Sequence, residues 1–216
     1  MTHIITIAQQ KGGAGKTTLA VSLAAWFARR MRVALFDIDP QHSAARWHRL
    51  REHRPQLPRL AFSDVAGWRL AGELDRLRAA HDLIIIDSPP HVETDARLAV
   101  RAADLILVPV QPSALDVWAA ESTLAIARAE KRPIRMVLNR LPAGNSKLAT
   151  QIRQMIADQG IETLNATLGN RTGFAQAFMN GMAVHEAVAR SVAAAELAAL
   201  AEEVWATIRS IGDKER

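Results

Sequence analysis

A glycine-rich stretch near the start of the chain limits the possible folds more than any other segment. It reads QKGGAGKTT and spans residues 10–18. Residues 4–8 before it are apolar and β-branched, which predicts a buried strand, and residues 19–27 after it are apolar almost all round, which predicts a buried helix. A glycine-rich turn between such elements curls tightly and directs backbone N–H groups toward one point. Because the helix start adds unpaired N–H groups and a positive dipole end, we expect the turn to bind a polyphosphate.

Two side chains in this stretch suit a nucleoside triphosphate with magnesium. Lys16 is expected to reach the β- and γ-phosphates, and the Thr17 hydroxyl is expected to bind Mg²⁺. The stretch departs from the usual pattern G-x-x-x-x-G-K-[ST], because Gln10 stands where the first glycine is expected, and a second lysine, Lys11, precedes the glycines. The expected nucleotide-binding residues are Gly12, Gly13, Ala14, Gly15, Lys16, Thr17 and Thr18.

Strand and helix patterns alternate along the whole chain. This alternation predicts an α/β fold with a mostly parallel twisted sheet and helices on both faces. Strands are expected at 4–8, 32–38, 60–65, 83–87, 105–110, 134–138 and 163–168. Helices are expected at 17–30, 44–53, 68–80, 116–130 and 146–159. The chain after residue 168 is expected to be helical, to be broken near Gly181 and to end in a helix at 192–211. No linker, repeat or low-complexity tract divides the chain, so we expect a single domain over residues 1–216.

Acidic side chains follow two of the predicted strands. Asp87 ends the apolar run at 83–87, while Asp37 and Asp39 end the run at 32–38. Asp37 and Asp39 project to the same side, because side chains alternate along a strand. Ligands of parallel sheets bind at the carboxyl ends of the strands, and Mg²⁺ needs only one or two carboxylates beside its waters. These acids beside a phosphate-binding turn therefore predict a site for Mg²⁺ and a reacting water.

The sequence resembles the deviant Walker A signature of the ParA/MinD family of P-loop ATPases. The resemblance rests on K-G-G-x-G-K-T at residues 11–17 and D-x-D-P-Q at residues 37–41, and is closest to the short ParA-like partition ATPases. It implies an ATPase that is weak until a partner stimulates it, with ATP and Mg²⁺ as ligands. It also implies that Asp87 holds Mg²⁺ in the Walker B manner, that Asp37 supports the metal shell and that Asp39 orients the attacking water. By the same resemblance, Lys11 reaches across an ATP-assembled homodimer to the partner's nucleotide.

Asn139 and Arg140 follow the predicted strand at 134–138. The pair matches the base-binding N-R of the family, and the resemblance implies that the Asn139 amide reads adenine while Arg140 stacks on the ring. The segment at 170–186 also resembles the short ParA-like proteins, so the likeness covers nearly the whole chain.

Composition excludes several classes. The chain has no cysteine, which excludes disulfides and iron–sulfur clusters. No apolar run reaches the ~18 residues that a membrane span needs, and no signal-peptide pattern is present, so we expect a cytoplasmic protein. The chain starts at the predicted phosphate-loop strand, so no N-terminal operator-binding domain is expected. The formal net charge of +5 suits a polyanionic partner.

The resemblance and the charge together imply an ATP-dependent dimerisation switch. Its ATP-bound form is expected to associate with the nucleoid by binding DNA without sequence preference. It is expected to segregate or position a cargo, a plasmid, chromosome region or protein cluster, through a ParB-like or cargo adaptor. The alternatives are a MinD-like positioning ATPase, a metabolic ligase of the dethiobiotin-synthetase type and a filament-forming scaffold. We expect no membrane contact, because the helix at 192–211 is acidic and its stripe of Trp205, Ile208 and Ile211 suits docking on the protein's own core.

Three groups of basic residues are candidates for DNA contacts. A solvated arginine-rich helix face explains the first group equally well. The groups are His42, Arg46, Arg49 and His53 on one helix face, with Arg51 and Arg54 nearby; Arg29, Arg30 and Arg32; and Arg153, Arg171 and Arg190.

Overall fold

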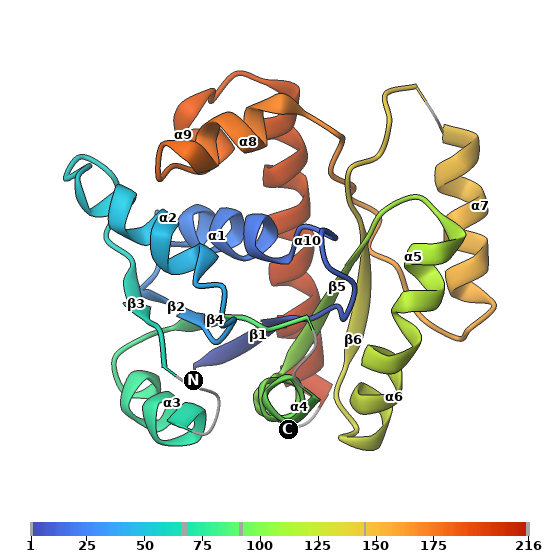
Figure 1. Ribbon diagram of the computed structural model, residues 1–216, viewed down its shortest axis with the longest axis horizontal. Helices are drawn as coiled ribbons and strands as arrows, with labels where there is room; N and C mark the ends of the chain where they lie inside the picture. The colour runs from blue at the N-terminus through green and yellow to red at the C-terminus, as the bar shows by residue number, and fades with distance from the viewer. Residues whose placement is uncertain (1, 66–68, 91–92, 145, 215–216) are drawn as a thin grey trace.

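The structure is a computed structural model that describes residues 2–65, 69–90, 93–144 and 146–214. The strands of these residues form one six-stranded sheet in the order β3-β2-β4-β1-β5-β6, and every neighbouring pair is parallel (Figure 1). The strands are β1 (His3–Ile7), β2 (Val33–Asp37), β3 (Ala61–Ser63), β4 (Leu83–Asp87), β5 (Leu105–Val110) and β6 (Ile134–Leu138). The predicted α/β fold is confirmed.

Helices cover both faces of the sheet, which makes the central strands fully buried (Figure 1). Alternate residues of β1 serve the two faces: Ile5 packs beneath one group of helices and Ile4 beneath the other. The first group is α1 (Lys16–Phe27), α2 (Ser43–Glu52), α8 (Thr172–Met179), α9 (Val184–Ala187) and α10 (Val192–Lys214). The second group is α3 (Leu70–Arg78), α4 (Glu93–Ala102), α5 (Ala114–Ala119), α6 (Glu121–Ala129) and α7 (Ser146–Ala157).

The expected last strand at 163–168 is wrong. This segment runs beside β6 but makes only isolated bridges, Met136 to Thr163 and Leu141 to Gly169. The Glu203 carboxylate accepts hydrogen bonds from the backbone N–H groups of Asn165 (2.8 Å) and Ala166 (2.7 Å). The N–H groups of Leu164 and Leu168 still donate to carbonyls of β6, at 2.9 Å each. Between them the segment bonds to a helix side chain, which interrupts the regular pattern of a strand.

Two further helix predictions need correction. The expected helix at 116–130 is two helices, α5 and α6, and α5 begins at Ala114 because the Ser113 side chain caps it by accepting from the Asp116 N–H. Helix α4 was not expected at all. The expected start of α3 at residue 68 lies outside the described residues, which resume at Arg69.

Helix α10 packs on the protein's own core, as expected. Ile208 is buried, and the Trp205 ring meets the rings of His3 and Phe27 at 5.5 and 5.8 Å. Within the described ranges, no helix combines the length and the apolar character needed to cross a bilayer.

Candidate nucleotide site

The glycine-rich loop lies between the carboxyl end of β1 and the start of α1. Gly13 and Gly15 adopt left-handed backbone conformations, with φ of 79° and 92°. A side chain at Gly12 or Gly13 would meet no atom within 4 Å, so open space lies against the loop. The first turn of α1 leaves backbone N–H groups unpaired beside this space. The loop can therefore accept an anionic group of several oxygens, as the sequence predicted.

Lys16 and the three predicted acids lie close together at this edge of the sheet. Asp37 and Asp87 are register partners on β2 and β4, and Asp39 follows two residues later. Burial lowers the pKa of the Lys16 ammonium, and the neighbouring carboxylates of Asp87 and Asp39 oppose that shift. Lys16 as a whole is only 6% exposed, and a buried cation beside a phosphate loop is placed to pair with an anion.

Asp87 has the properties expected of a metal-binding carboxylate. It is fully buried, and neither of its oxygens has a hydrogen-bond partner. Burial raises the pKa of Asp87 to about 8; the Thr17 hydroxyl and Lys16 lower it, while Asp37 and Asp39 raise it further. The Thr17 hydroxyl is near enough to stabilise the Asp87 carboxylate, although the two groups do not form a regular hydrogen bond. Two buried oxygens without donors fit a cation, so Asp87 and Thr17 suit Mg²⁺.

This site would rely on few protein ligands. In the described part of the chain, no cluster of three or more acidic or histidine side chains forms a metal cage. Mg²⁺ commonly takes one or two protein oxygens together with waters and substrate phosphates. The donor set is therefore adequate for Mg²⁺ with a nucleotide.

Asp37 and Asp39 also organise the backbone that leads into α2. Asp37 accepts hydrogen bonds from the N–H groups of Asp39 (3.0 Å) and Ala45 (2.9 Å), and Asp39 accepts one from Gln41 (2.9 Å). Burial raises the pKa of Asp37, and the two backbone hydrogen bonds oppose the rise. Each carboxylate keeps further acceptor capacity, so the roles predicted for them at the metal and the water stay predictions.

Lys11 precedes the loop glycines, and its side chain is held within its own chain. Its Nζ pairs with Asp116 Oδ2 at 2.5 Å, and the Ser113 hydroxyl donates to the same oxygen at 2.7 Å. The Asp116 side chain is 3% exposed and its other oxygen has no partner, whereas the Lys11 side chain is 36% exposed. The Gln111 amide donates to the Gly13 carbonyl (3.2 Å), which ties the same segment to the loop.

Sequence reasoning missed Asp116. A signal was present, since S-A-L-D at 113–116 follows a buried strand and is typical of a capped helix start. That signal identifies a cap; it gives no hint of the ion pair with Lys11.

Asn139 and Arg140 line a cavity of about 140 Å³ next to the loop, together with Gly15, Thr18 and Phe174. The Asn139 amide donates to the Ala14 carbonyl at 2.8 Å, and its oxygen accepts from the Arg140 N–H at 3.0 Å. In this structure Asn139 therefore fixes the phosphate loop. Its predicted reading of adenine stays a prediction, as does the stacking of Arg140, which is exposed beside the cavity.

The structure narrows the basic candidates for DNA contact. Arg51 is buried in an ion pair with Glu186, and the Arg54 side chain donates to the Asn180 carbonyl. Most of the other candidates also have partners: Arg29 lies over Trp26, Arg30 pairs with Glu202, Arg32 with Asp82, Arg171 with Glu196, and Arg153 donates to two carbonyls. Arg46 and Arg49 on α2, and Arg190, are exposed and have no ion pair within the described residues.

Known proteins resemble this chain in sequence. The family described as the CobQ/CobB/MinD/ParA nucleotide binding domain matches residues 5–184. The chain is 31% identical to the chromosome-partitioning ATPase Soj of Thermus thermophilus, over 95% of this chain and 96% of Soj. It is 29% identical to the maintenance of carboxysome distribution protein A of Halothiobacillus neapolitanus, over 89% of this chain and 91% of that protein.

Solved structures agree in fold. McdA of Cyanothece in complex with ATP superposes with a TM-score of 0.75 and 20% identity, over 94% of this chain and 96% of that chain. MinD of Pyrococcus horikoshii with Mg-ADP gives a TM-score of 0.76 and 19% identity, over the same shares. The matched residues include the phosphate loop, both acidic strand ends and Asn139. The chain therefore belongs to the CobQ/CobB/MinD/ParA nucleotide-binding domain family, within its ParA/MinD group of P-loop ATPases.

Proposed function

We propose that the protein is an Mg²⁺-dependent ATPase that dimerises with ATP, binds DNA without sequence preference and positions a cargo. The position of Lys11 is the observation that carries this proposal. Lys16 already supplies a buried cation to the phosphate loop of its own protomer. Lys11 is a second, partly exposed cation at the mouth of the same loop, tethered by one ion pair. A lysine held there suits delivery to the phosphates of a second copy.

Hydrolysis would depend on positioning and charge neutralisation. The loop amides and Lys16 would hold the β- and γ-phosphates, and Thr17 and Asp87 would hold Mg²⁺. Bound Mg²⁺ would neutralise charge on the phosphate oxygens. Asp37 would support the metal shell, and Asp39, fixed by its bond from the Gln41 N–H, would orient the attacking water. Lys11 of the partner would stabilise the charge that develops on the transferred group.

The dimer would act as a switch because ATP binds its two states differently. A ligand can shift an equilibrium only by its differential affinity for the two states. ATP with two lysines from two protomers would favour the dimer, and loss of the γ-phosphate would weaken it.

Three lysine variants test this part of the proposal. Lys16→Ala should lose nucleotide binding. Lys11→Ala should bind a fluorescent ATP analogue normally, stay monomeric in analytical ultracentrifugation with a non-hydrolysable analogue, and hydrolyse ATP about 10²-fold more slowly or worse. Lys147→Ala, which removes an exposed lysine from α7, is the matched control and should behave as wild type. A Lys11→Ala protein that dimerises and hydrolyses normally would overturn the proposal.

DNA binding is supported by the net charge of +5 and by the exposed arginines of α2. Fluorescence anisotropy with a mixed-sequence duplex should show binding with the ATP analogue and little with ADP. The logarithm of affinity should fall by roughly 0.9 per phosphate contact for each log unit of salt. Arg46→Gln and Arg49→Gln should each reduce that slope, whereas Arg209→Gln, an exposed site on α10, should not. An ATP-bound form that ignores DNA at about 50 mM salt would refute this part.

The cargo would be engaged through an adaptor protein that stimulates hydrolysis. Relatives of this chain are named for chromosome partitioning and for carboxysome distribution, which supports a positioning role. A fluorescent fusion should follow the nucleoid, and the Lys16→Ala fusion should be diffuse.

A further inference from the structure

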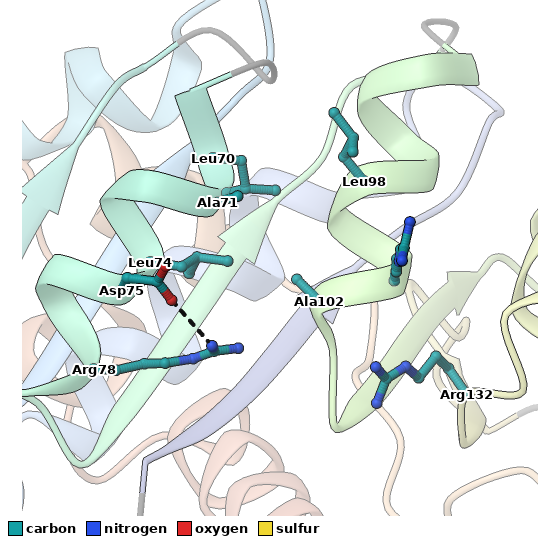
Figure 2. A pocket seen from close by; sticks show the side chains of 9 residues that line it. Leu70, Ala71, Leu74, Asp75, Arg78, Leu98, Ala102 and Arg132 are labelled. Atoms are coloured by element: carbon teal, nitrogen blue, oxygen red, sulfur yellow. Dashed lines mark hydrogen bonds and ion pairs between the residues drawn. The ribbon is translucent and has the colours of Figure 1, made fainter.

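A second cavity lies between helices α3 and α4, on the face of the sheet opposite α1 (Figure 2). Its volume is about 310 Å³. Its walls carry apolar side chains, mainly Leu70, Leu74 and Leu98, together with the cations Arg78, Arg101 and Arg132 and one acid, Asp75. None of these residues takes part in the nucleotide site.

The apolar and the cationic side chains lie at different ends of the cavity. Leu70, Leu74 and Arg78 follow one another at intervals of four residues, so they form one stripe of α3. Leu98 and Arg101 lie on one face of α4, one turn apart. Figure 2 shows Leu70 and Leu98 at one end, with Arg78 and Arg132 at the other. The cavity therefore has an apolar end and a cationic end.

The cavity wall has three arginines and one acid, Asp75. Arg78 pairs with Asp75 at 3.3 Å. Within the described residues, the Arg101 and Arg132 side chains have no hydrogen-bond or ion-pair partner. Glu130 pairs with Arg97 at 2.7 Å and is thus already engaged. Arg78 and Arg101 lie in the last turns of α3 and α4, at the negative end of each helix dipole. Arg132 follows the end of α6, where its backbone N–H donates to the Ala127 carbonyl at 2.9 Å.

We infer that this cavity is a binding site for a small amphipathic anion. Its carboxylate-type head would bind Arg101 and Arg132, and its apolar tail would lie against Leu70, Leu74 and Leu98. At about 30 Å³ for each water-sized group, the volume holds roughly ten heavy atoms. From Leu70 to Arg78 the helix rises about 12 Å. Octanoate has this size and this polarity.

Other ligands fit less well. Duplex DNA would leave the apolar end unused. A partner protein would bury roughly 800 Å² of each surface, far more than this cavity provides. Small-molecule sites are concave and mostly apolar with a few polar groups, as this one is.

The inference does not depend on the proposed ATPase function. Arg132 lies at the amino end of β6, whereas the phosphate loop and Asp87 lie at the carboxyl ends of the strands. Binding at the cavity and binding of nucleotide can therefore be measured separately.

Calorimetric titration of the full chain with octanoate tests the site. We expect a dissociation constant of about 1 mM or below, which is reasonable for ten heavy atoms. Hexanoate should bind about 15-fold more weakly, because each methylene contributes about fourfold. Octanol, which has the same chain and no charge, should bind at least tenfold more weakly than octanoate.

Substitutions in the cavity wall test whether octanoate binds there. Arg101→Gln and Arg132→Gln should each weaken octanoate binding about tenfold, while Arg209→Gln on α10 serves as the matched control. Ala71→Trp, at an exposed position on the rim, should block binding while far-UV circular dichroism and nucleotide binding stay unchanged. Equal binding of octanol and octanoate, or unchanged affinity in both arginine variants, would overturn the inference. So would tight binding of a peptide of alternating leucine and glutamate by a protein that ignores octanoate.

Discussion

Replacing Asp116 by asparagine should make the protein dimerise more readily. Lys11 is held by Asp116 within its own chain, and the proposed dimer needs that lysine at the partner's nucleotide. Each protomer must therefore break one ion pair before it can lend its lysine. Asparagine keeps the shape of the side chain and can still accept the Ser113 hydrogen bond, but it holds Lys11 only weakly.

The size of the effect follows from the exposure of the two partners. Asp116 is 3% exposed and Lys11 is 36% exposed, so the pair lies between a buried and a surface ion pair. Surface pairs contribute up to about 1 kcal/mol, and hydrogen bonds to charged groups about 1.5–3 kcal/mol. A value of about 1–2 kcal/mol for each pair is reasonable, and a symmetric dimer breaks two. Dimerisation should therefore tighten by about 2–4 kcal/mol, which is about 30- to 700-fold.

Sedimentation velocity with a non-hydrolysable ATP analogue measures this dimerisation constant over a range of protein concentrations. Asp158→Asn removes an exposed carboxylate at the end of α7 and serves as the control for net charge. Nucleotide affinity of the monomer should not change. If Asp116→Asn dimerises no better than wild type, Asp116 does not restrain Lys11 and the reasoning fails.

Three other variants test the structure. Gly15→Ala should abolish nucleotide binding, because φ at Gly15 is 92° and a Cβ would collide with the Asn139 amide; equilibrium dialysis showing affinity within twofold of wild type would contradict this. Arg51→Met should lower the free energy of unfolding in urea by about 3 kcal/mol, since it leaves the buried Glu186 carboxylate without its cation, and a loss below about 1 kcal/mol would argue against that role. Burial lowers the pKa of His185 to about 4, so below about pH 6.5 the unfolded chain binds a proton that the folded protein does not. The free energy of unfolding therefore decreases as the pH is lowered from about 6.5 toward 4. When the pH is lowered from 7 to 5, the free energy of unfolding of wild type should decrease by about 1 kcal/mol more than that of His185→Gln, after allowance for partial exposure. Equal decreases in the two proteins would show that His185 is not the group responsible.

Most of the fold was predictable because its signals are local. The six strands of the sheet appear as short apolar runs, and the phosphate loop is marked by glycines whose positive φ the structure confirms. The segment at 163–168 has the same local pattern and is not a regular strand. Two of its backbone N–H groups, those of Asn165 and Ala166, donate to Glu203 on α10, and no local pattern of the sequence reveals that distant contact.

The ion pair of Lys11 with Asp116 could not be predicted from the sequence, for a related reason. Lys11 and Asp116 are 105 residues apart, and only the order of the sheet joins them. The phosphate-loop strand β1 lies between β4 and β5, so the segments that follow these two strands are the ones placed beside the loop. Asp87 ends β4, and Asp116 lies six residues beyond the end of β5. Asp87 could be assigned from the sequence because it is the last residue of its strand. The role of Asp116 could be assigned only with the strand order known. The Ser-x-x-Asp pattern at 113–116 is fully explained as a helix cap, so it gives no reason to look for a lysine partner.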